Sequence, residues 1–143
     1  MSNKQGVRKG LGDGTLMKYW RQAVLAKYQG RCAFTGHSII EQCECHHIVT
    51  RRHKILRWDH RNGIPLSAST YEDTLIEGHT AHGFGHTKLG ELRIQETIGD
   101  DYEYLCRLQQ KTYKDYLFEL GITDSEFRQK KKDELLEIIK MGG

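Results

Sequence analysis

Two adjacent histidines, His46 and His47, are the residues of this chain best suited by type and spacing to chemistry. Imidazole is the commonest transition-metal ligand in proteins and also accepts a proton near neutral pH, so neighbouring histidines can divide these two tasks. Consecutive side chains of an ideal strand point to opposite faces. If both imidazoles serve one site, we expect His47 to lie where its strand ends, with its side chain turned back.

The histidine pair lies in a stretch that is typical of two short strands joined by a basic loop. The stretch covers residues 44–67 and reads ECHHIVTRRHKILRWDHRNGIPLS. Residues 64–66 form the second apolar run, directly after Asn62 and Gly63 at the far end of the loop. The amide of Asn62 can hydrogen-bond across the base of the loop. We therefore expect Asn62 to hold the loop closed.

This ordered set of residues resembles the HNH endonucleases of the His-Me finger, or ββα-metal, superfamily, and in particular the small phage-type HNH nucleases. The resemblance spans about residues 18–86 and is carried by Trp20, Arg21, Gln22, Ala23, Val24, Arg31, Cys32, His46, His47, Ile48, Arg57, Trp58, Asp59, Asn62 and Gly63. It implies a metal-dependent hydrolase that nicks DNA or cuts both strands. It also implies that His46 binds the metal, that His47 is the general base and that Asn62 orients the loop.

The resemblance also implies further metal ligands beyond the hairpin. The family usually places a metal-binding histidine at the start of the finger helix, where this chain has Tyr71. The nearest histidines are His79, His82 and His86, and His79 lies eight positions after Tyr71, about two helical turns. We take His79 as the second ligand and His82 as the third, in an order that could be reversed. The expected cofactor is one divalent ion: Mg²⁺, Mn²⁺, Ni²⁺ or Zn²⁺.

A structural zinc is not expected in this chain. Many relatives hold one between two Cys-x-x-Cys or Cys-x-x-His pairs, whereas the corresponding positions here are Cys32 with Thr35 and Ser67 with Thr70. Hydroxyl groups bind zinc poorly. A zinc on Cys32, Cys43, Cys45 and one histidine remains an alternative, although Cys-x-Cys is not a usual zinc spacing. Otherwise we expect the four cysteines to be free thiols.

The charge distribution predicts a polyanionic partner. Residues 1–61 hold 12 Lys and Arg against 4 Asp and Glu, whereas residues 62–143 hold 10 against 15. A basic surface next to a phosphodiester-cleaving site can clamp phosphate groups, so DNA is the expected partner. The candidate DNA-binding residues are Arg51, Arg52, Lys54, Arg57 and Arg61. The competing interpretation of this basic loop is an ordinary solvated surface.

Length and composition predict a single globular domain. The chain has 143 residues, of which 37% are hydrophobic and 29% charged. It has no apolar run long enough to cross a bilayer and no apolar signal core in its polar N-terminus. We therefore expect a cytoplasmic protein, in the bacterial host cytoplasm if it is phage-encoded, with no membrane partner. A homodimer stays open, because half-site recognition would need one but no coiled-coil heptad is present.

The predicted fold class is α+β: a ββα-metal (His-Me) finger with a two-stranded antiparallel hairpin, packed among N- and C-terminal α-helices. Residues 1–14 are expected to form a flexible basic tail and residues 15–143 one domain. Within this domain we expect a helix at 15–30, the HNH ββα finger at 31–90 and helices at 91–143.

Finer patterns predict elements within the finger and the C-terminal part. Residues 31–34 and 43–49 have strand-like patterns, and a capping-box pattern at Ser69 predicts a short helix from about Thr70 to before Gly78. Apolar residues recur at helical spacing over residues 100–120, with Gly121 as the stop. A second capping box, at residues 123–126, opens a last helix toward Lys140.

Other functional interpretations remain open. The histidine pair can be two ordinary strand residues, and the finger can be a decayed module that binds DNA or a protein without cleaving. Tyr71 and the missing zinc pairs favour decay, whereas His46, His47 and Asn62 argue against it. A structural zinc protein is the third interpretation, and it predicts unfolding when zinc is removed.

Overall fold

The computed structural model describes residues 11–36, 38, 43–67 and 87–142. Within them the chain is α+β, with five α-helices and a two-stranded antiparallel hairpin, as expected. The elements are α1 (Asp13–Lys27), β2 (Cys43–His47), the 3-10 turn η2 (His60–Asn62), β3 (Gly63–Ser67), α3 (Lys88–Ile98), α4 (Asp101–Gln109), α5 (Tyr113–Leu120) and α6 (Asp124–Gly142). Among the described helices, none is long and apolar enough to span a membrane.

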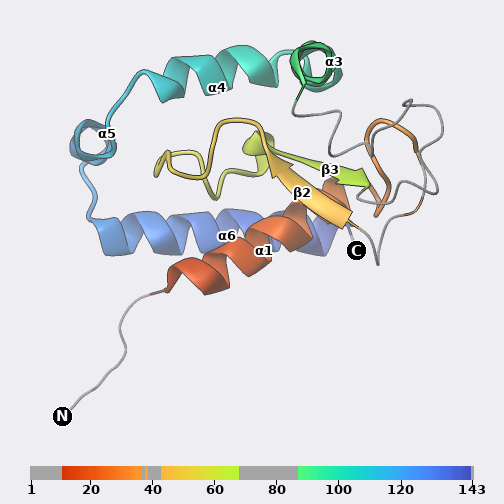
Figure 1. The fold of residues 1–143 in the computed structure, drawn as a ribbon. Coiled ribbons are helices and arrows are strands. Elements are labelled where there is room, and N and C mark those ends of the chain that lie inside the picture. The colour runs from red at the N-terminus through yellow and green to blue at the C-terminus, as the bar shows by residue number, and fades with distance from the viewer. Residues whose placement is uncertain (1–10, 37, 39–42, 68–86, 143) are drawn as a thin grey trace.

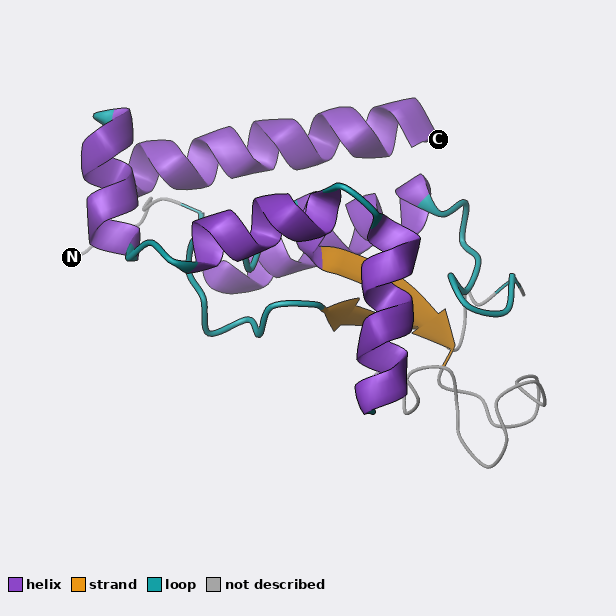
Figure 2. Cartoon of the chain, turned by 90° about the horizontal axis from the view of Figure 1, so that it is seen from above, coloured by secondary structure: helices purple, strands orange, loops and turns teal. Residues whose placement is uncertain are grey.

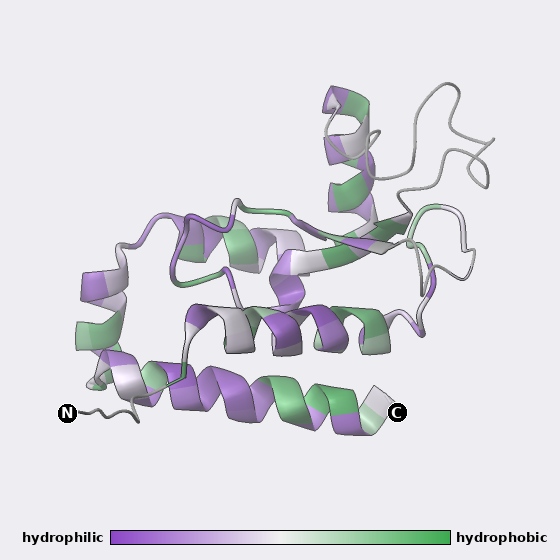
Figure 3. Ribbon diagram, turned by 60° about the horizontal axis from the view of Figure 1, so that its bottom comes forward, coloured by the Kyte–Doolittle hydropathy of each residue, from purple (hydrophilic) through white to green (hydrophobic). Residues whose placement is uncertain are grey.

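The hairpin lies between two layers of helices (Figures 1 and 3). Helices α1 and α6 pack against each other on one side, and α3 and α4 lie on the other. Seen from above, α3 lies across the strands (Figure 2). The register pairs Cys43 with Ser67 at one end and His47 with Gly63 at the other. The two histidines are therefore at the end of the hairpin next to the basic loop.

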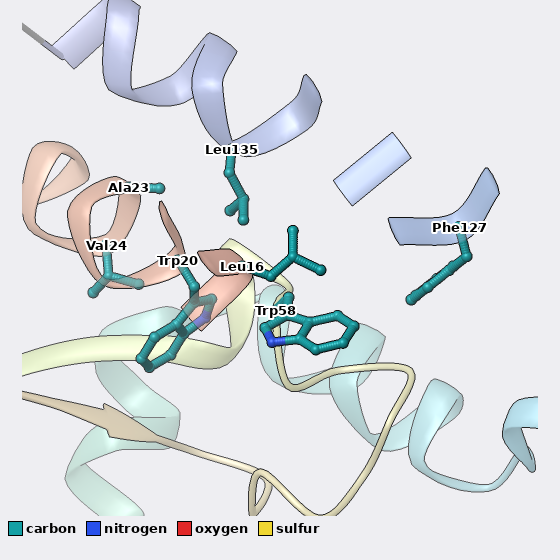
Figure 4. Close-up of a cluster of buried hydrophobic side chains, with 7 residues drawn as sticks. All are labelled: Leu16, Trp20, Ala23, Val24, Trp58, Phe127 and Leu135. Atoms are coloured by element: carbon teal, nitrogen blue, oxygen red, sulfur yellow. The ribbon is translucent and has the colours of Figure 1, made fainter. Parts of the chain in front are cut away.

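Three groups of buried side chains connect these layers. Ile94 of α3 packs against Ile64 and Leu66 of the hairpin, and Leu105 of α4 packs against the loop residue Leu56. The largest group joins α1, the loop and α6 (Figure 4); its buried members are Leu16, Trp20, Ala23, Val24, Trp58, Phe127 and Leu135. In α6 the hydrophobic residues gather in the C-terminal half (Figure 3). The basic loop is therefore anchored in the core on both sides, which gives the histidines a rigid support.

Several local predictions are confirmed. The capping box that opens α6 is formed, because Thr123 N–H donates to Glu126 Oε1 at 2.8 Å and Glu126 N–H donates to Thr123 Oγ1 at 3.1 Å. Gly121 ends α5 in the left-handed conformation, with φ 69°. Trp20 and Trp58 are core residues. These features depend on near neighbours or on large apolar side chains, so sequence patterns predict them well.

Other predicted boundaries differ from the structure. Helix α1 begins at Asp13, inside the range predicted as a tail, while residues 1–10 lie outside the described residues. Residues 31–34 do not form a strand beyond one bridge between Arg31 and Ser38, because the chain turns there. In this turn Gly36 N–H donates to Cys32 O at 2.8 Å. The helix predicted at 70–78 lies outside the described residues.

The predicted helix over residues 100–120 is two helices, and the first helix of the predicted C-terminal range begins before residue 91. Helices α4 and α5 are separated because Thr112 caps α5 by accepting a hydrogen bond from Asp115 N–H at 3.1 Å. Helix α3 straddles the predicted boundary at residue 90 and is capped in the same way by Thr87. The amphipathic pattern of α3 is weak, because Leu89 and Leu92 are exposed while Ile94 is buried.

Asp59 is a buried carboxylate that links four parts of the chain. Its backbone carbonyl accepts a hydrogen bond from Trp20 Nε1 at 2.8 Å, and its side chain accepts hydrogen bonds from Tyr104 Oη and Arg61 N–H. Lys131 Nζ of α6 lies 3.9 Å from Asp59 Oδ2, and both side chains are over 90% buried. A buried ion pair destabilises a fold strongly when one partner is neutralised.

Asp59→Asn is therefore expected to lower the free energy of unfolding by about 3 kcal/mol, because it leaves the Lys131 ammonium buried with less compensation. Urea unfolding followed by circular dichroism measures this change. Asp101→Asn is a matched control, since Asp101 lies 4.0 Å from Arg61 in a half-exposed pair that contributes little. A loss for Asp59→Asn no larger than the loss for Asp101→Asn would contradict the prediction.

Candidate active site

The position of His47 follows from where β2 ends. His47 is the last residue of β2, as predicted for an imidazole that must turn back toward its neighbour's site. Beyond it the chain continues in register for one more bond, from Ile48 N–H to Asn62 O at 3.2 Å. The basic loop then leaves the hairpin, so His47 lies at the junction of strand and loop.

Asn62 closes the base of this loop through its side chain, as predicted. It is fully buried; its Oδ1 accepts a hydrogen bond from Val49 N–H at 2.7 Å. Its Nδ2 donates to Val49 O at 2.9 Å and to Leu56 O at 3.2 Å. One amide therefore satisfies three backbone groups that the ladder of the hairpin does not reach. The position of Arg57, next to Leu56, is set by these bonds.

The backbone of Arg57 in turn orients the imidazole of His47. His47 Nε2 lies 3.0 Å from Arg57 O. A carbonyl oxygen only accepts hydrogen bonds, so Nε2 must carry the proton, and in the neutral ring Nδ1 is then the nitrogen that accepts one. Nδ1 has no hydrogen-bond partner among the described residues. This arrangement is the one that a general base requires.

A ring-on-ring contact from outside the hairpin also holds His47. The indole of Trp20, on α1, stacks on the imidazole with ring centroids 3.8 Å apart and planes 6° from parallel. Burial lowers the pKa of His47 below its ordinary value of 6.5, and the positive charges of Arg51 and Arg21 lower it further. The hydrogen bond to Arg57 O opposes this shift. The neutral, proton-accepting form therefore dominates at pH 7.

Both histidines face one pocket of about 360 Å³ between the end of β2 and helices α3 and α4. Its lining residues are His46, His47, Ile48, Val49, Thr50, Glu91, Ile94, Gln95, Tyr102, Leu105, Cys106 and Gln109. His46 and His47 therefore both contribute to the lining of this pocket although they are neighbours on a strand. Glu91 and Gln95 come from α3, most of which lies in the range 91–143 predicted to be helical, although its ends were not predicted. The Thr87 cap and the spacing of four between Glu91 and Gln95 were the available signals.

The chemistry of these donors suits a divalent ion, but the described residues do not complete a site. Imidazole and carboxylate groups are ligands for Zn²⁺, Ni²⁺ and Mn²⁺, and the pocket offers His46 and Glu91. Among the described residues, no group of three His, Cys, Asp or Glu side chains lies close enough to hold a metal ion. The predicted ligands His79 and His82 lie outside the described residues.

The five basic side chains predicted to bind DNA have different surroundings. Arg51 and Arg52 are exposed at the turn of the loop, and Lys54 is exposed beside the ring of Tyr113. Arg61 lies over the ring of Tyr104. The side chain of Arg57 contacts Trp58 and Asp13. Arg51, Arg52 and Lys54 are therefore the exposed cations among these five.

Arg57 is largely occupied within the fold. Its guanidinium lies 4.5 Å from the ring centroid of Trp58 and 3.4 Å from Asp13, and only 18% of the side chain is exposed. Arg128 lies near the same indole, 4.9 Å from its centroid, and also pairs with Asp13, at 2.8 Å. Trp58 is thus flanked by two arginines that share one carboxylate. This arrangement fixes the loop segment whose carbonyl binds His47.

The positions that hold zinc in relatives come together around one sulfur. Cys32 Sγ accepts hydrogen bonds from Thr35 N–H and Ser67 N–H, both at 3.4 Å, and Cys32 and Ser67 are buried. Three of the four positions thus form a turn against the end of β3, with one thiol among them; Thr70 lies outside the described residues. The thiols of Cys32 and Cys106 are free.

The junction of β2 and its loop therefore has two properties that a hydrolytic site needs: an oriented imidazole with one nitrogen left to accept a proton, and a pocket that His46 and His47 both line. Comparison with known proteins found no matching family model, no similar curated protein and no similar solved structure.

Proposed function

We propose that this chain is a metal-dependent endonuclease of the HNH type that hydrolyses DNA phosphodiester bonds, with His47 as its general base. The observation that carries this proposal is the hydrogen bond from His47 Nε2 to Arg57 O, which leaves Nδ1 as the proton acceptor of a residue that lines one pocket together with His46. The ordered resemblance to HNH nucleases supports the same assignment. Phage-type enzymes of this kind act inside the cytoplasm, which is where we expect this chain to work.

In the proposed reaction, His47 Nδ1 takes a proton from a water molecule aimed at the phosphorus atom. General base catalysis of this kind contributes about 10²- to 10⁴-fold to a rate. Arg57 O and Asn62 do not react; they hold the ring and the loop so that Nδ1 keeps its direction. His47 becomes an imidazolium, and the 3′ oxygen leaves the phosphorus.

His46, His79 and His82 are the proposed ligands of one divalent ion, Mg²⁺, Mn²⁺, Ni²⁺ or Zn²⁺, and Glu91 is a further candidate from α3. When bound, such an ion stabilises the charge that builds on the scissile phosphate and on the leaving oxygen. We do not propose a structural zinc, because Cys32 is the one thiol among the described zinc-pair positions.

DNA is proposed to approach over the loop that carries Arg51 and Arg52. These exposed cations contact phosphate oxygens, and Lys54 and Arg61 extend the positive surface on either side. Such contacts position the backbone without reading the sequence. Whether one strand or two are cut then depends on whether a second copy of the chain binds the opposite strand, so a homodimer belongs to the double-strand version of this proposal.

The test is a supercoiled-plasmid assay with the purified chain in Mg²⁺, Mn²⁺, Ni²⁺ or Zn²⁺ and with EDTA. We expect nicked or linear DNA with at least one ion and none with EDTA, because leaving-group stabilisation needs the metal. DNA binding without cleavage in every metal would instead support the second candidate, a decayed finger, which Tyr71 at the usual ligand position favours. Cleavage that persists in EDTA would refute metal dependence.

The lowered pKa of His47 predicts the pH dependence of cleavage. Only neutral imidazole accepts a proton, and a pKa below 6.5 keeps the ring neutral to lower pH. We therefore expect kcat/KM to rise with pH through a midpoint below about 6.5 and to be level above it. His60→Gln is the matched control: burial, followed by the charge of Lys27, also lowers the pKa of His60, but His60 does not line the pocket. A midpoint above 6.5, or one that moves with His60→Gln, would contradict this assignment.

A further inference from the structure

The contact between Trp20 and His47 joins helix α1 to the proposed base. The two rings are stacked with centroids 3.8 Å apart and planes 6° from parallel. Trp20 is fully buried and cannot turn easily, because its Nε1 donates a hydrogen bond of 2.8 Å to Asp59 O. Figure 4 shows the indole pointing from α1 toward the hairpin. The stack is therefore a rigid surface and not a chance contact of mobile side chains.

Gly63 makes room for this stack. It pairs with His47 across the hairpin, so a side chain at this position would lie next to the imidazole. A Cβ atom on Gly63 would lie 2.6 Å from Trp20 Cζ2 and 2.4 Å from Val24 Cγ2, far inside van der Waals contact. The backbone conformation of Gly63 is extended, with φ −139°, so close approach and not strain requires glycine here. The indole occupies the space that a side chain would take.

One hydrogen bond does not by itself fix an imidazole. The bond from His47 Nε2 to Arg57 O holds one edge of the ring, but the ring can still rotate about that bond and change the direction of Nδ1. A parallel stack removes this rotation, because any tilt would drive the imidazole into the indole face. The indole face also attracts the cation that forms when His47 takes a proton. The hydrogen bond to Arg57 O therefore fixes one edge of the His47 ring, and the stack on Trp20 fixes its plane.

We infer that Trp20 is a positioning residue for His47: its stacked indole sets the plane of the imidazole and so fixes the direction in which Nδ1 accepts a proton. The inference rests on the proposed function for its catalytic meaning, but its structural part concerns the tautomer and orientation of His47 alone. Trp20 itself reaches no reacting atom, because its polar Nε1 is bonded to Asp59 O on the side of the core. The α1 helix thereby becomes part of the active site's support.

The NMR part of the test uses the full chain without added metal, and cleavage rates are measured in the divalent ion that supports plasmid cleavage. Side-chain ¹⁵N NMR reports which nitrogen of His47 is protonated, and a pH titration of the same signals reports its pKa. In the unmodified chain we expect Nε2 to be protonated. In Trp20→Leu we expect a mixture of both tautomers, a changed pKa and a cleavage rate about 10- to 100-fold lower, as for a misplaced catalytic group. Trp20→Phe restores an aromatic face, and we expect it to recover most of the tautomer preference and rate.

Leu135→Ala is the matched control, because Leu135 on α6 belongs to the same buried cluster and the stacking partner of His47 is Trp20. It should lower stability without changing the His47 tautomer. If Trp20→Leu does not fold, Gly63→Ala applies the same test by pushing a methyl group against the indole. The inference is overturned if the folded variants keep the His47 tautomer, pKa and rate of the unmodified chain. If the unmodified chain cleaves no DNA, the proposed function fails, while the NMR result still decides whether Trp20 orients His47.

Discussion

Replacing His47 with alanine is expected to lower DNA cleavage by about 10²- to 10⁴-fold, the usual contribution of a general base. The physical reason is that water at neutral pH is a poor nucleophile until a positioned base takes its proton. In this chain the hydrogen bond to Arg57 O leaves Nδ1 of His47 as the nitrogen that accepts the proton. The rate is measured as the first-order conversion of supercoiled plasmid under saturating protein and metal.

The His47→Ala experiment needs controls for folding and for DNA binding. His53→Ala removes another imidazole of the same loop, whose Nε2 lies 3.2 Å from Gln109 O, and it should keep the cleavage rate within a few fold. DNA affinity of His47→Ala should stay close to that of the unmodified chain, because the phosphate contacts assigned to Arg51 and Arg52 are intact. If His47→Ala cleaves at the original rate, His47 is not the base.

Replacing Asn62 with aspartate is expected to have the largest effect on stability. The side chain donates to two carbonyls, Val49 O and Leu56 O, and accepts from Val49 N–H in a fully buried position. A carboxylate cannot donate, so the variant would bury a negative charge against two carbonyl oxygens. We expect a loss of more than about 3 kcal/mol for Asn62→Asp, and about 3 kcal/mol for Asn62→Ala, which leaves a buried N–H unpaired.

Urea unfolding measures these losses, and hydrogen exchange of the Val49 amide locates them. Gln129→Ala is a control, because the amide of Gln129 is exposed and its loss should change stability by no more than about 0.5 kcal/mol. A loss below 1 kcal/mol for both Asn62 variants would show that the loop does not depend on this side chain. Because Asn62 also sets the position of the Arg57 carbonyl, cleavage should fall in any Asn62 variant that remains folded.

The variants of His47 and Asn62 distinguish a catalytic role from a structural one. His47→Ala should leave the fold intact, since His47 is half-buried and makes one hydrogen bond. Asn62 variants should weaken the fold first and cleavage as a consequence. The opposite pattern, an unstable His47 variant and a stable but inactive Asn62 variant, would assign the catalytic role to the amide instead.

The amino-acid sequence by itself predicted the elements that depend on near neighbours. The hairpin, the capping box at Thr123 and the stop at Gly121 follow from local hydrogen bonds and backbone conformation, which short sequence patterns encode. The end of β2 at His47 was also predictable, as was the closing role of Asn62. Asn62, for example, bonds a backbone group that lies within about 15 positions along the chain.

The tertiary structure decided which distant side chains surround the histidines. Glu91 reaches their pocket because α3 crosses the hairpin, Trp20 meets His47 from α1, and Arg57 is bound by Asp13 and Trp58. The spacing of residues in a single sequence does not predict these long-range contacts, because they depend on how the layers of helices pack on the hairpin. The predicted strand at 31–34 failed for the same reason: Cys32 takes hydrogen bonds from Thr35 and from the end of β3, and these bonds turn the chain.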